Sequence, residues 1–570
     1  MSQVLTRGFD NLNRVIDFYA SKTPDAIAML QYEDGKQLSY KQFSRLIDLF
    51  ALRLLDSGLK KGDVVATQLV LIPEHVILMY ACFKIGVIIA PLDLRLKPEE
   101  IVRDINKIQP TIFFSLGKTP ITDFNKVAEA VRGNCDSVKN IVQFVPKEQN
   151  KMVIDGAVAI SDFLGKSRLI YLKLKNLFTG QLKSVYRQVK PRTPALIIFT
   201  TGTTGPPKPA LLCHQNILVQ NEILSRGIGE LKNDLVTMVN LPPSHVGCVT
   251  ETLMTTFYQG GSSVLLKIFD VEHTLKAIEK HSVNLLGQIP TQFRMLWAHP
   301  EYDRFDLSSL ESVIYAGSAG DLPFLKKLAK MAAHIGTGLG MTENAGFATF
   351  SSLGITPENL VGQVGSPFDD LAKVTIRKPM NSDGTAGDEV AVGESGEICY
   401  HPPIVFLGYY NQQEESRKAI SNEGILYTGD LGYFKKMETE SEPVLYLSGR
   451  RKFVIKQKGY NVFPTDVEEH LAGLAGVDEV EVVGVKHSLF DEGIFAFIKL
   501  KGNAQVTLDA MHQHCKLIAS YKRPQHIEIW KEETEFPLTR SAKVDKLALQ
   551  KLAVARIEEL RREGGWDAVK

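Results

Sequence analysis

Short apolar runs alternate with amphipathic stretches over most of the chain before Gly362, and this alternation constrains the fold more than any other feature. Strand-length runs such as Val64–Leu71 and Ser312–Tyr315 are followed by segments with helical periodicity, Glu74–Ile85 and Leu322–Ala333. Strands that alternate with helices are typical of α/β layers with largely parallel sheets. We therefore expect a large N-terminal α/β domain of stacked sheets and helices.

The pattern changes twice along the chain. After Gly362 it turns to short β-rich segments with many glycines, which indicate a small sheet or barrel. Beyond Lys452 strands and helices alternate again on a smaller scale, as in the expected helix Thr465–Leu471. A chain of 570 residues is also longer than one core normally supports. The sequence thus predicts two domains: 1–451 with a β-rich subdomain, and a small, mobile α+β cap domain, 452–570.

Composition excludes several classes of protein. The 66 basic and 65 acidic residues nearly balance, so nothing global favours a nucleic-acid partner. The six cysteines lie far apart without a CxxC pair, which excludes a zinc ribbon and argues against a disulfide scaffold. The N-terminus does not resemble a signal peptide, and no run of about 18 apolar residues occurs. We expect a cytoplasmic enzyme.

The segment 166–192 is basic throughout and contains no acidic residue. Between its lysines and arginines, apolar side chains from Ile170 to Val189 recur at helical spacing. Two interpretations remain open. A surface helix could pack its apolar side on the domain, or an interfacial helix could make a peripheral contact with anionic lipid. The oligomeric state, monomer or homodimer, is equally open.

One loop carries the strongest chemical signal. The sequence Phe199-Thr-Thr-Gly-Thr-Thr-Gly-Pro-Pro-Lys-Pro209 directly follows the apolar run Ala195–Phe199. Glycines let a backbone approach a phosphate chain, hydroxyls and N–H groups supply donors, and Lys208 adds a charge suited to the β- and γ-phosphates. A P-loop is excluded because prolines flank Lys208, and Gly336–Met341 lacks the third glycine of a dinucleotide fingerprint.

Four further motifs follow in order: Gly338-Leu-Gly-Met-Thr-Glu343, Tyr427-Thr-Gly-Asp430, Ser448-Gly-Arg-Arg-Lys-Phe-Val-Ile-Lys-Gln-Lys-Gly459 and Pro537-Leu-Thr-Arg-Ser-Ala-Lys543. With the loop, they resemble the signatures of the adenylate-forming superfamily, which includes acyl-CoA synthetases, peptide-synthetase adenylation domains and firefly luciferases. The chain is most similar to the AMP-forming acyl-CoA synthetases. The resemblance covers essentially the whole chain, and five ordered motifs are far more specific than any one.

The resemblance assigns catalytic roles to three residues, Lys543, Glu343 and Lys208. Glu343 is a hard oxygen ligand suited to Mg²⁺, which neutralises phosphate charge. Lys543, on the mobile domain, would reach both the substrate carboxylate and the α-phosphate. Asp430 suits a ribose diol, and Arg450 is a second expected ribose ligand. The full set expected to bind ATP or AMP is Thr200, Thr201, Gly202, Thr203, Thr204, Gly205, Ser318, Gly338, Gly340, Met341, Thr342, Asp430 and Arg450.

The same resemblance implies an acyl pocket, a hinge and a tunnel for coenzyme A. The pocket residues would be His245, Gly287, Gly317 and Leu339. A lone histidine such as His245 is as often a structural residue, so its role in gating the substrate stays open. Lys452 would be the hinge about which the C-terminal domain rotates after adenylation. Gly459 would line the tunnel through which the pantetheine arm enters.

Three positions depart from the family pattern. Pro209 and Ala542 each replace a usual glycine, and Leu339 replaces a tyrosine and could widen the acyl pocket. None of these changes removes a charged group, so the expected chemistry stays intact.

The sequence therefore predicts a ligase that activates a medium-chain, aromatic or alicyclic carboxylic acid with ATP and Mg²⁺, as in fatty acid metabolism. The acyl-adenylate is then passed to CoA with release of AMP, and the reaction could also run in reverse. Its partners would be these small molecules and no nucleic acid. Two alternatives remain: an enzyme that loads a carrier-protein thiol, and a non-catalytic nucleotide-binding regulator.

Overall fold

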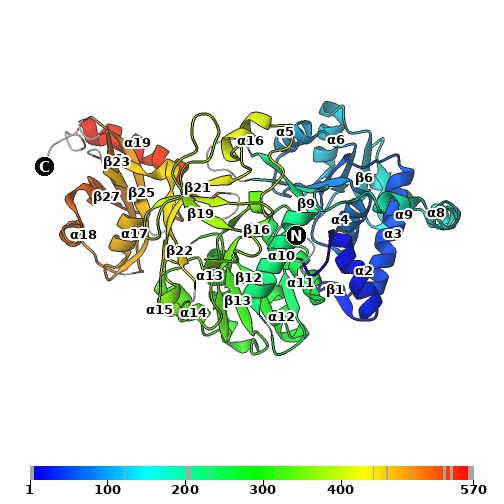
Figure 1. Cartoon of the computed structure of the whole chain (residues 1–570), viewed down its shortest axis with the longest axis horizontal. Coiled ribbons are helices and arrows are strands. Elements are labelled where there is room, and N and C mark those ends of the chain that lie inside the picture. Colours follow the sequence, from blue (N-terminus) through cyan, green and yellow to red (C-terminus); the bar gives the residue numbers. More distant parts are fainter. Residues whose placement is uncertain are drawn as a thin grey trace.

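The computed structural model describes residues 6–120, 122–200, 207–229, 231–318, 320–438, 440, 442–457, 460–488, 491–502, 504–530, 534–539, 543–562 and 566. Its layers follow the expected α/β plan, with a large N-terminal part and a smaller C-terminal part at one end of the long axis (Figure 1). The predicted fold class, a large α/β N-terminal domain with a small C-terminal domain, is confirmed.

The first large sheet has seven strands among the described residues, in the order β7-β6-β5-β3-β4-β8-β9. Its pairs are parallel except for β8 with β9, which form an antiparallel pair. The strands are β7 (Val158–Ala159), β6 (Asn140–Phe144), β5 (Ile112–Leu116), β3 (Val64–Gln68), β4 (Ile88–Pro91), β8 (Pro194–Phe199) and β9 (Pro209–Cys213). The helices that accompany this sheet are α3 (Tyr40–Asp56), α4 (Pro73–Ile85), α5 (Pro98–Ile108), α6 (Asn125–Asn134), α7 (Ile160–Phe163) and the 3₁₀ turn η1 (Lys147–Met152).

The second large sheet also has seven strands in the described part, ordered β14-β13-β12-β10-β11-β1-β2. It is parallel apart from the edge pair β1 and β2. The strands are β14 (His334–Gly336), β13 (Ser312–Tyr315), β12 (Leu285–Gln288), β10 (Val236–Val239), β11 (Ser262–Leu265), β1 (Ile27–Gln31) and β2 (Gln37–Ser39). Its helices and helical turns are α11 (Thr255–Gln259), α12 (Val271–His281), α13 (Pro290–Trp297), α14 (Leu322–Leu328), α15 (Pro357–Leu360), η2 (Gly247–Met254) and η3 (Tyr302–Arg304).

Helices α4 and α10 (His214–Ile228) lie in the core that the two large sheets share. Every residue of α4 except Glu74 is buried, and α10 is buried along almost its whole length. A helix that is apolar on all sides has to lie inside the protein. This shared core fixes the two sheets relative to each other, and with them the loops at the ends of their strands.

A small antiparallel sheet of four strands joins the large sheets to the C-terminal part. The short, glycine-rich β segments after Gly362 predicted a small sheet or barrel in this region. Its strands are β19 (Val374–Arg377), β20 (Gly396–Tyr400), β21 (Leu426–Lys435) and β22 (Val444–Arg450), with α16 (Gln413–Ala419) beside them. Short pairs precede it: β15 (Gly340–Met341) with β16 (Gly346–Phe347), and β17 (Thr349–Phe350) with β18 (Ser366–Pro367), with the turn η4 (Thr342–Asn344) between β15 and β16.

The C-terminal part has its own sheet and its own apolar clusters. Its strands are β23 (Ile455–Gln457), β24 (Tyr460–Val462), β25 (Val477–His487), β26 (Asp491–Leu500) and β27 (His526–Ile529). Its helices and turns are α17 (Pro464–Ala472), α18 (Leu508–Cys515), α19 (Lys546–Arg562), η5 (Arg451–Phe453) and η6 (Ser520–Lys522). The predicted boundary at 451/452 falls in η5, between two sheets, and stays a prediction.

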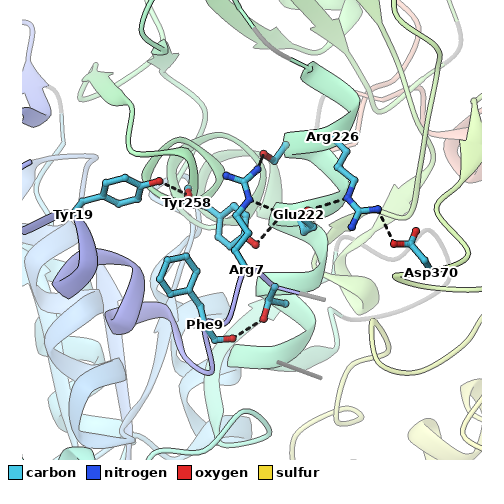
Figure 2. Close-up of polar contacts among 9 residues, drawn as sticks. Arg7, Phe9, Tyr19, Glu222, Arg226, Tyr258 and Asp370 are labelled. Atoms are coloured by element: carbon cyan, nitrogen blue, oxygen red, sulfur yellow. Dashed lines mark hydrogen bonds and ion pairs between the residues drawn. The ribbon is translucent and has the colours of Figure 1, made fainter. Parts of the chain in front are cut away.

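A polar network ties the N-terminal segment before α2 (Leu12–Lys22) to α10 (Figure 2). Glu222 on α10 is buried and accepts hydrogen bonds from Nε of Arg7 at 3.0 Å and from the hydroxyl of Tyr258 at 2.9 Å. Arg226, one turn further along the helix, donates to Glu222 at 2.9 Å and to Asp370 at 2.7 Å. One buried carboxylate thus connects the N-terminal segment, α10, α11 and the loop before β19.

The basic segment 166–192 forms two helices, α8 (Lys166–Thr179) and α9 (Gln181–Tyr186), rather than one. Gly180 separates them with φ 60°. The expectation that its apolar side packs on the domain holds only in part: Leu182 and Val189 are buried, but most apolar side chains of α8 are exposed. None of the described helices is long and apolar enough to cross a membrane.

Candidate active site

A cavity of about 1530 Å³ lies where the carboxyl ends of parallel strands from both large sheets meet. The segments that follow β4, β8, β10, β12 and β13 all line it. Ligands of open α/β sheets bind at this edge of the strands. Small-molecule pockets usually measure about 300–1,000 Å³, so this cavity has room for more than one small molecule.

The base of the predicted phosphate loop opens into this cavity. Thr200 and Lys208 both line it, and they close the loop by a bond from the Thr200 N–H to the Lys208 carbonyl at 2.9 Å. Nζ of Lys208 lies 2.5 Å from Oε2 of Glu415 and 5.1 Å from the ring centre of Tyr409. The intervening loop residues expected to bind phosphate, Thr201, Gly202, Thr203, Thr204 and Gly205, lie outside the described residues.

Glu343 is buried at the wall of the cavity, in η4, and the hydroxyl of Tyr409 donates to its Oε1 at 2.7 Å. Burial raises the pKa of Glu343, while the bond from Tyr409 and the charges of Arg450 and Lys208 oppose that rise. Tyr409 therefore links the predicted metal ligand to the predicted phosphate-binding lysine.

The residues around Glu343 fit a magnesium ion that is shared with a nucleotide. No group of three or more histidine, cysteine or acidic side chains among the described residues could hold a metal by itself. Mg²⁺ is usually bound through one or two carboxylates plus substrate phosphates and water. Glu343 supplies one carboxylate beside Lys208, and Tyr409 occupies only its Oε1.

Asp430 and Arg450, the two expected ribose ligands, face each other on neighbouring strands β21 and β22. Nε of Arg450 lies 2.8 Å from Oδ1 of Asp430. The N–H of Asp430 donates to the hydroxyl of Thr428 at 3.0 Å, which orients the turn that precedes it. Both residues line the cavity, so the structure brings this predicted pair together.

Lys543 enters the same cavity from the C-terminal part of the chain. A Cβ atom added to Gly317 would lie 3.4 Å from Cε of Lys543. Protein surrounds the ammonium group on most sides and lowers the pKa of Lys543, first by desolvation and then by the charge of Arg450. The side chain still faces the open space of the cavity. A lysine distant in sequence thus lies beside Asp430 and Arg450.

The predicted glycines line the cavity for two different reasons. Gly317 has φ 97°, a conformation that favours glycine. Gly338 and Gly340 allow close approach of backbones, because an added Cβ would lie 2.1 Å from the carbonyl oxygen of Thr349 and 2.0 Å from that of Gly346. The remaining nucleotide-binding candidates, Ser318, Met341 and Thr342, also line the cavity.

The four acyl-pocket candidates His245, Gly287, Gly317 and Leu339 all line the cavity. Nε2 of His245 lies 3.7 Å from Oδ2 of Asp93, beyond hydrogen-bond distance. Burial would raise the pKa of Asp93, but the hydrogen bonds from Arg95 hold it well below its usual range. An added Cβ on Gly287 would only touch Thr252, at 3.4 Å.

A half-buried carboxylate that the sequence did not point to lies in the same region. Glu251, on the π-helical turn η2, lines the cavity and has no hydrogen-bond partner among the described residues. Burial raises the pKa of Glu251 to about 7, with Lys543 acting in the opposite direction. Single π-helical turns occur frequently at functional sites.

The hinge candidate Lys452 lines the cavity, and the tunnel candidate Gly459 lies outside the described residues. Lys452 is in η5, lines the cavity, and has its pKa lowered to about 8 by desolvation and by Arg450. Gly459 and Ala542 lie outside the described residues. The roles of all the site candidates stay predictions.

Tyr409, Glu415 and Glu251 are the main residues that sequence reasoning missed. Tyr409 stands in Gly408-Tyr-Tyr-Asn411, an aromatic turn that could have drawn attention. Nothing local relates it to Glu343, which lies 66 positions away. Glu415 sits among other charges on an exposed helix, and Glu251 in an otherwise ordinary helical stretch, so neither carried a signal.

Comparison with known proteins agrees with this geometry. The model of the AMP-binding enzyme family matches residues 16–410, and that of the AMP-binding enzyme C-terminal domain matches residues 466–543. A long-chain-fatty-acid–CoA ligase of Bacillus subtilis (strain 168) is 28% identical over 533 residues, covering 91% of each chain. An indoleacetate–CoA ligase of Aromatoleum aromaticum is also 28% identical and covers 96% of this chain and 98% of its own.

Solved structures share the fold. The structure of an o-succinylbenzoate coenzyme A synthetase from Bacillus subtilis in complex with ATP and magnesium ion superimposes with a TM-score of 0.71. It is 20% identical and covers 94% of this chain and 99% of its own. The names of the relatives agree with the predicted enzyme class, an acid–thiol ligase. The match over most of the length, together with the motifs that converge on one cavity, shows that this chain belongs to the family of AMP-binding enzymes.

Proposed function

We propose that the protein is an AMP-forming acyl-CoA synthetase. In the first half-reaction a carboxylate oxygen attacks the α-phosphorus of ATP, the bond to the β-phosphate oxygen breaks, and pyrophosphate leaves. In the second, the thiol of CoA attacks the acyl carbonyl, and the bond to AMP breaks. Both steps need alignment and charge stabilisation more than a covalent nucleophile.

The observation that carries the proposal is the position of Lys543. It shares one cavity with Glu343, Asp430 and Arg450, although the chain separates it from them by most of the C-terminal part. With the ribose on Asp430 and Arg450, the α-phosphate would lie within reach of its ammonium group. Lys543 then neutralises the charge that develops on the α-phosphoryl oxygens and orients the attacking carboxylate.

Lys208 and Glu343 act at the other end of the nucleotide. Lys208 exchanges Glu415 for the β- and γ-phosphates and so holds the pyrophosphate as it leaves. Glu343, positioned by Tyr409, would hold the magnesium ion. When bound, Mg²⁺ neutralises phosphate charge and fixes the phosphate chain for in-line displacement.

The second half-reaction requires a different arrangement of the C-terminal part. Lys452 is the proposed hinge, since η5 is the short connection between the small sheet and the C-terminal sheet. Gly459 is the proposed lining of the pantetheine tunnel. Rotation would withdraw Lys543 from the cavity once the adenylate has formed, and bring the face that admits the thiol to the same place.

The proposed acid is medium-chain, aromatic or alicyclic. The apolar side chains of Val246, Ile289 and Leu339 line the same cavity as Gly287 and Gly317. Such a wall suits a hydrocarbon or ring. The relatives named as a long-chain-fatty-acid–CoA ligase and an indoleacetate–CoA ligase provide one aliphatic and one aromatic example of such acids. Reversal, from acyl-CoA, AMP and pyrophosphate to ATP, remains part of the proposal.

Two other functions make different predictions. An enzyme that loads a carrier protein would transfer the acyl group to a protein-bound phosphopantetheine faster than to free CoA. A non-catalytic regulator would bind ATP without exchanging pyrophosphate. Lys208, Glu343, Asp430 and Lys543 are all present and brought together, which favours catalysis.

The test is a screen of AMP release with CoA present, over aliphatic acids of increasing length and a set of aromatic and alicyclic acids. We expect AMP and acyl-CoA to form in equal amounts with at least one acid. Pyrophosphate exchange without acyl-CoA formation would favour the carrier-protein alternative. ATP binding with neither activity for any acid would favour the regulator.

A further inference from the structure

Helix α8 carries an apolar face that points away from the rest of the protein. The exposed side chains on this face are Ile170, Tyr171, Leu174, Leu177 and Phe178, and Phe178 and Leu177 are 90% and 71% exposed. At 3.6 residues per turn they fall within about a third of the helix circumference. The side chains that face the protein, Leu172 foremost, lie on the opposite side. The helix is therefore apolar on two faces, and the domain covers only one of them.

Basic residues border the outer face on both sides. Helical geometry places Lys166 and Lys173 along one edge of the face and Arg168 and Lys175 along the other. The whole segment holds eight basic residues and no acid: Lys166, Arg168, Lys173, Lys175, Lys183, Arg187, Lys190 and Arg192. Within the described part of the chain only Arg168 forms an ion pair, with Asp56 at 2.6 Å. The other seven charges remain available to an external partner.

Helices α8 and α9 are held in place by packing and polar contacts. The outer face of α8 is therefore not free to turn towards the domain. Leu172 of α8 and Leu182 of α9 are buried. The hydroxyl of Tyr186, at the end of α9, donates to Oδ2 of Asp17 at 3.0 Å, and Nη2 of Arg168 lies 2.6 Å from Oδ1 of Asp56. Both contacts fix α8 and α9 to the N-terminal helices, with α8 projecting at the extreme end of the molecule (Figure 1).

We propose that α8 binds the surface of an anionic phospholipid bilayer. Its outer apolar side chains would enter the boundary between headgroups and acyl chains, with the helix lying in the plane of the membrane. An interfacial helix needs this arrangement: an apolar face bordered by lysine and arginine, with the charges at headgroup level. This inference does not depend on the identity of the acid or on the thiol acceptor.

Charge decides between a membrane and a second copy of the chain. In a dimer formed through two copies of this face, the basic borders would lie against each other, and like charges at close range repel. An anionic membrane presents the opposite sign over an extended area. Each lysine or arginine near such a surface strengthens binding by about 1 kcal/mol, which is about fivefold in the partition coefficient.

The test is flotation of the full-length protein with vesicles of phosphatidylcholine, with and without about one-third phosphatidylglycerol. We expect binding to the anionic vesicles, little binding to the neutral ones, and weakening at about 0.5 M salt. Phe178→Glu should reduce the partition coefficient by at least about tenfold, because it removes the most exposed ring and adds a repelling charge. Lys173→Glu/Lys175→Glu should reduce it by a similar factor.

The matched control is Leu517→Glu/Lys501→Glu, which changes an exposed leucine and an exposed lysine in the C-terminal part. It should bind vesicles like the unaltered protein. Pyrophosphate exchange by the α8 variants with a water-soluble acid should stay at the unaltered rate, which shows that they are folded. Absence of binding to anionic vesicles, or equal loss in the control, overturns the proposal. So does a dimer in sedimentation analysis that Phe178→Glu converts to a monomer without any vesicle binding.

Discussion

Lys543 reaches the cavity from the C-terminal part of the chain, so its contribution can be separated from those of the residues beneath it. Lys543→Ala should lower the rate of pyrophosphate exchange by about 10²–10³, because it removes a charge that stabilises the transition state of adenylation. Acyl transfer from supplied acyl-adenylate to CoA should persist, since the lysine is proposed to act in one orientation only. Both half-reactions are measured separately, and equal loss of the two would contradict the assignment.

The raised pKa of Glu251 predicts that KM for the acid depends on pH, while KM for ATP does not change to the same extent. With its pKa raised to about 7, the side chain is mostly neutral below pH 7 and ionised above it. The ionised form repels the substrate carboxylate, so KM for the acid should rise as the pH increases from about 6 to 8, by up to about tenfold. KM for ATP, which binds on the side of Asp430, should change much less.

Glu251→Gln is the variant that tests this assignment, because it keeps the size of the side chain and removes the charge. Its KM for the acid should stay low and flat over the same pH interval. A KM that rises with pH in the variant as in the unaltered protein would mean that another group titrates.

At the scale of single residues, the sequence could predict a set of motif residues that the structure brings together. Lys208, Glu343, Asp430, Arg450 and Lys543 all line one cavity, as the resemblance implied. The sequence could not reveal the groups that position these residues. Tyr409 and Glu415 contact Glu343 and Lys208 across segments far apart in the chain. Glu251 lines the same cavity without such a contact. A tyrosine or glutamate outside a motif carries no signal in the sequence.

At the scale of elements, α10 depends on the carboxylate that it buries. Glu222→Gln should destabilise the protein by about 2–3 kcal/mol, because Arg7 and Arg226 lose a charged acceptor in a buried position (Figure 2). The measurement is the free energy of unfolding in urea. Glu272→Gln serves as the control, since its pair with Lys276 is exposed to solvent and should contribute far less to stability. Similar losses in the two variants would contradict a structural role for the buried network.

The positions of strands and helices could be predicted closely where periodicity was strong. Strand β13 has the expected bounds, and α4 begins one residue earlier than expected. The helix expected over Leu322–Ala333 ends at Leu328. Gly180 divides the basic segment because it adopts a left-handed conformation, and a single glycine in a helical pattern does not reveal that. Local patterns also cannot show which apolar face lacks a covering element.

At the scale of the whole molecule, Lys452 tests whether rotation of the C-terminal part separates the half-reactions. Proline fixes φ near −65°, which the short turn η5 tolerates but a rotating hinge does not. Lys452→Pro should therefore keep pyrophosphate exchange near its normal rate and lower acyl-CoA formation by more than about tenfold. Lys452→Ala keeps the backbone free and should support both reactions. Normal steady-state turnover of the proline variant would place the hinge elsewhere.

The sequence predicts that a C-terminal domain exists, but not its orientation. Orientation follows from contacts across the cavity, such as those of Lys543 near Gly317 and Asp430, which no periodicity encodes. The motif around Lys543 indicates which kind of group the lysine binds. Its distances from Gly317 and Asp430 are set by the folded chain and cannot be predicted from the motif.

The positions of α8 and of the C-terminal sheet, at opposite ends of the long axis, bear on how the protein can work while attached to a surface (Figure 1). A molecule tethered through α8 would have its C-terminal part at the end of the long axis opposite to the attachment point. The part that is proposed to rotate would then move on the side away from the headgroups. Attachment through α8 would therefore leave the proposed rotation unhindered.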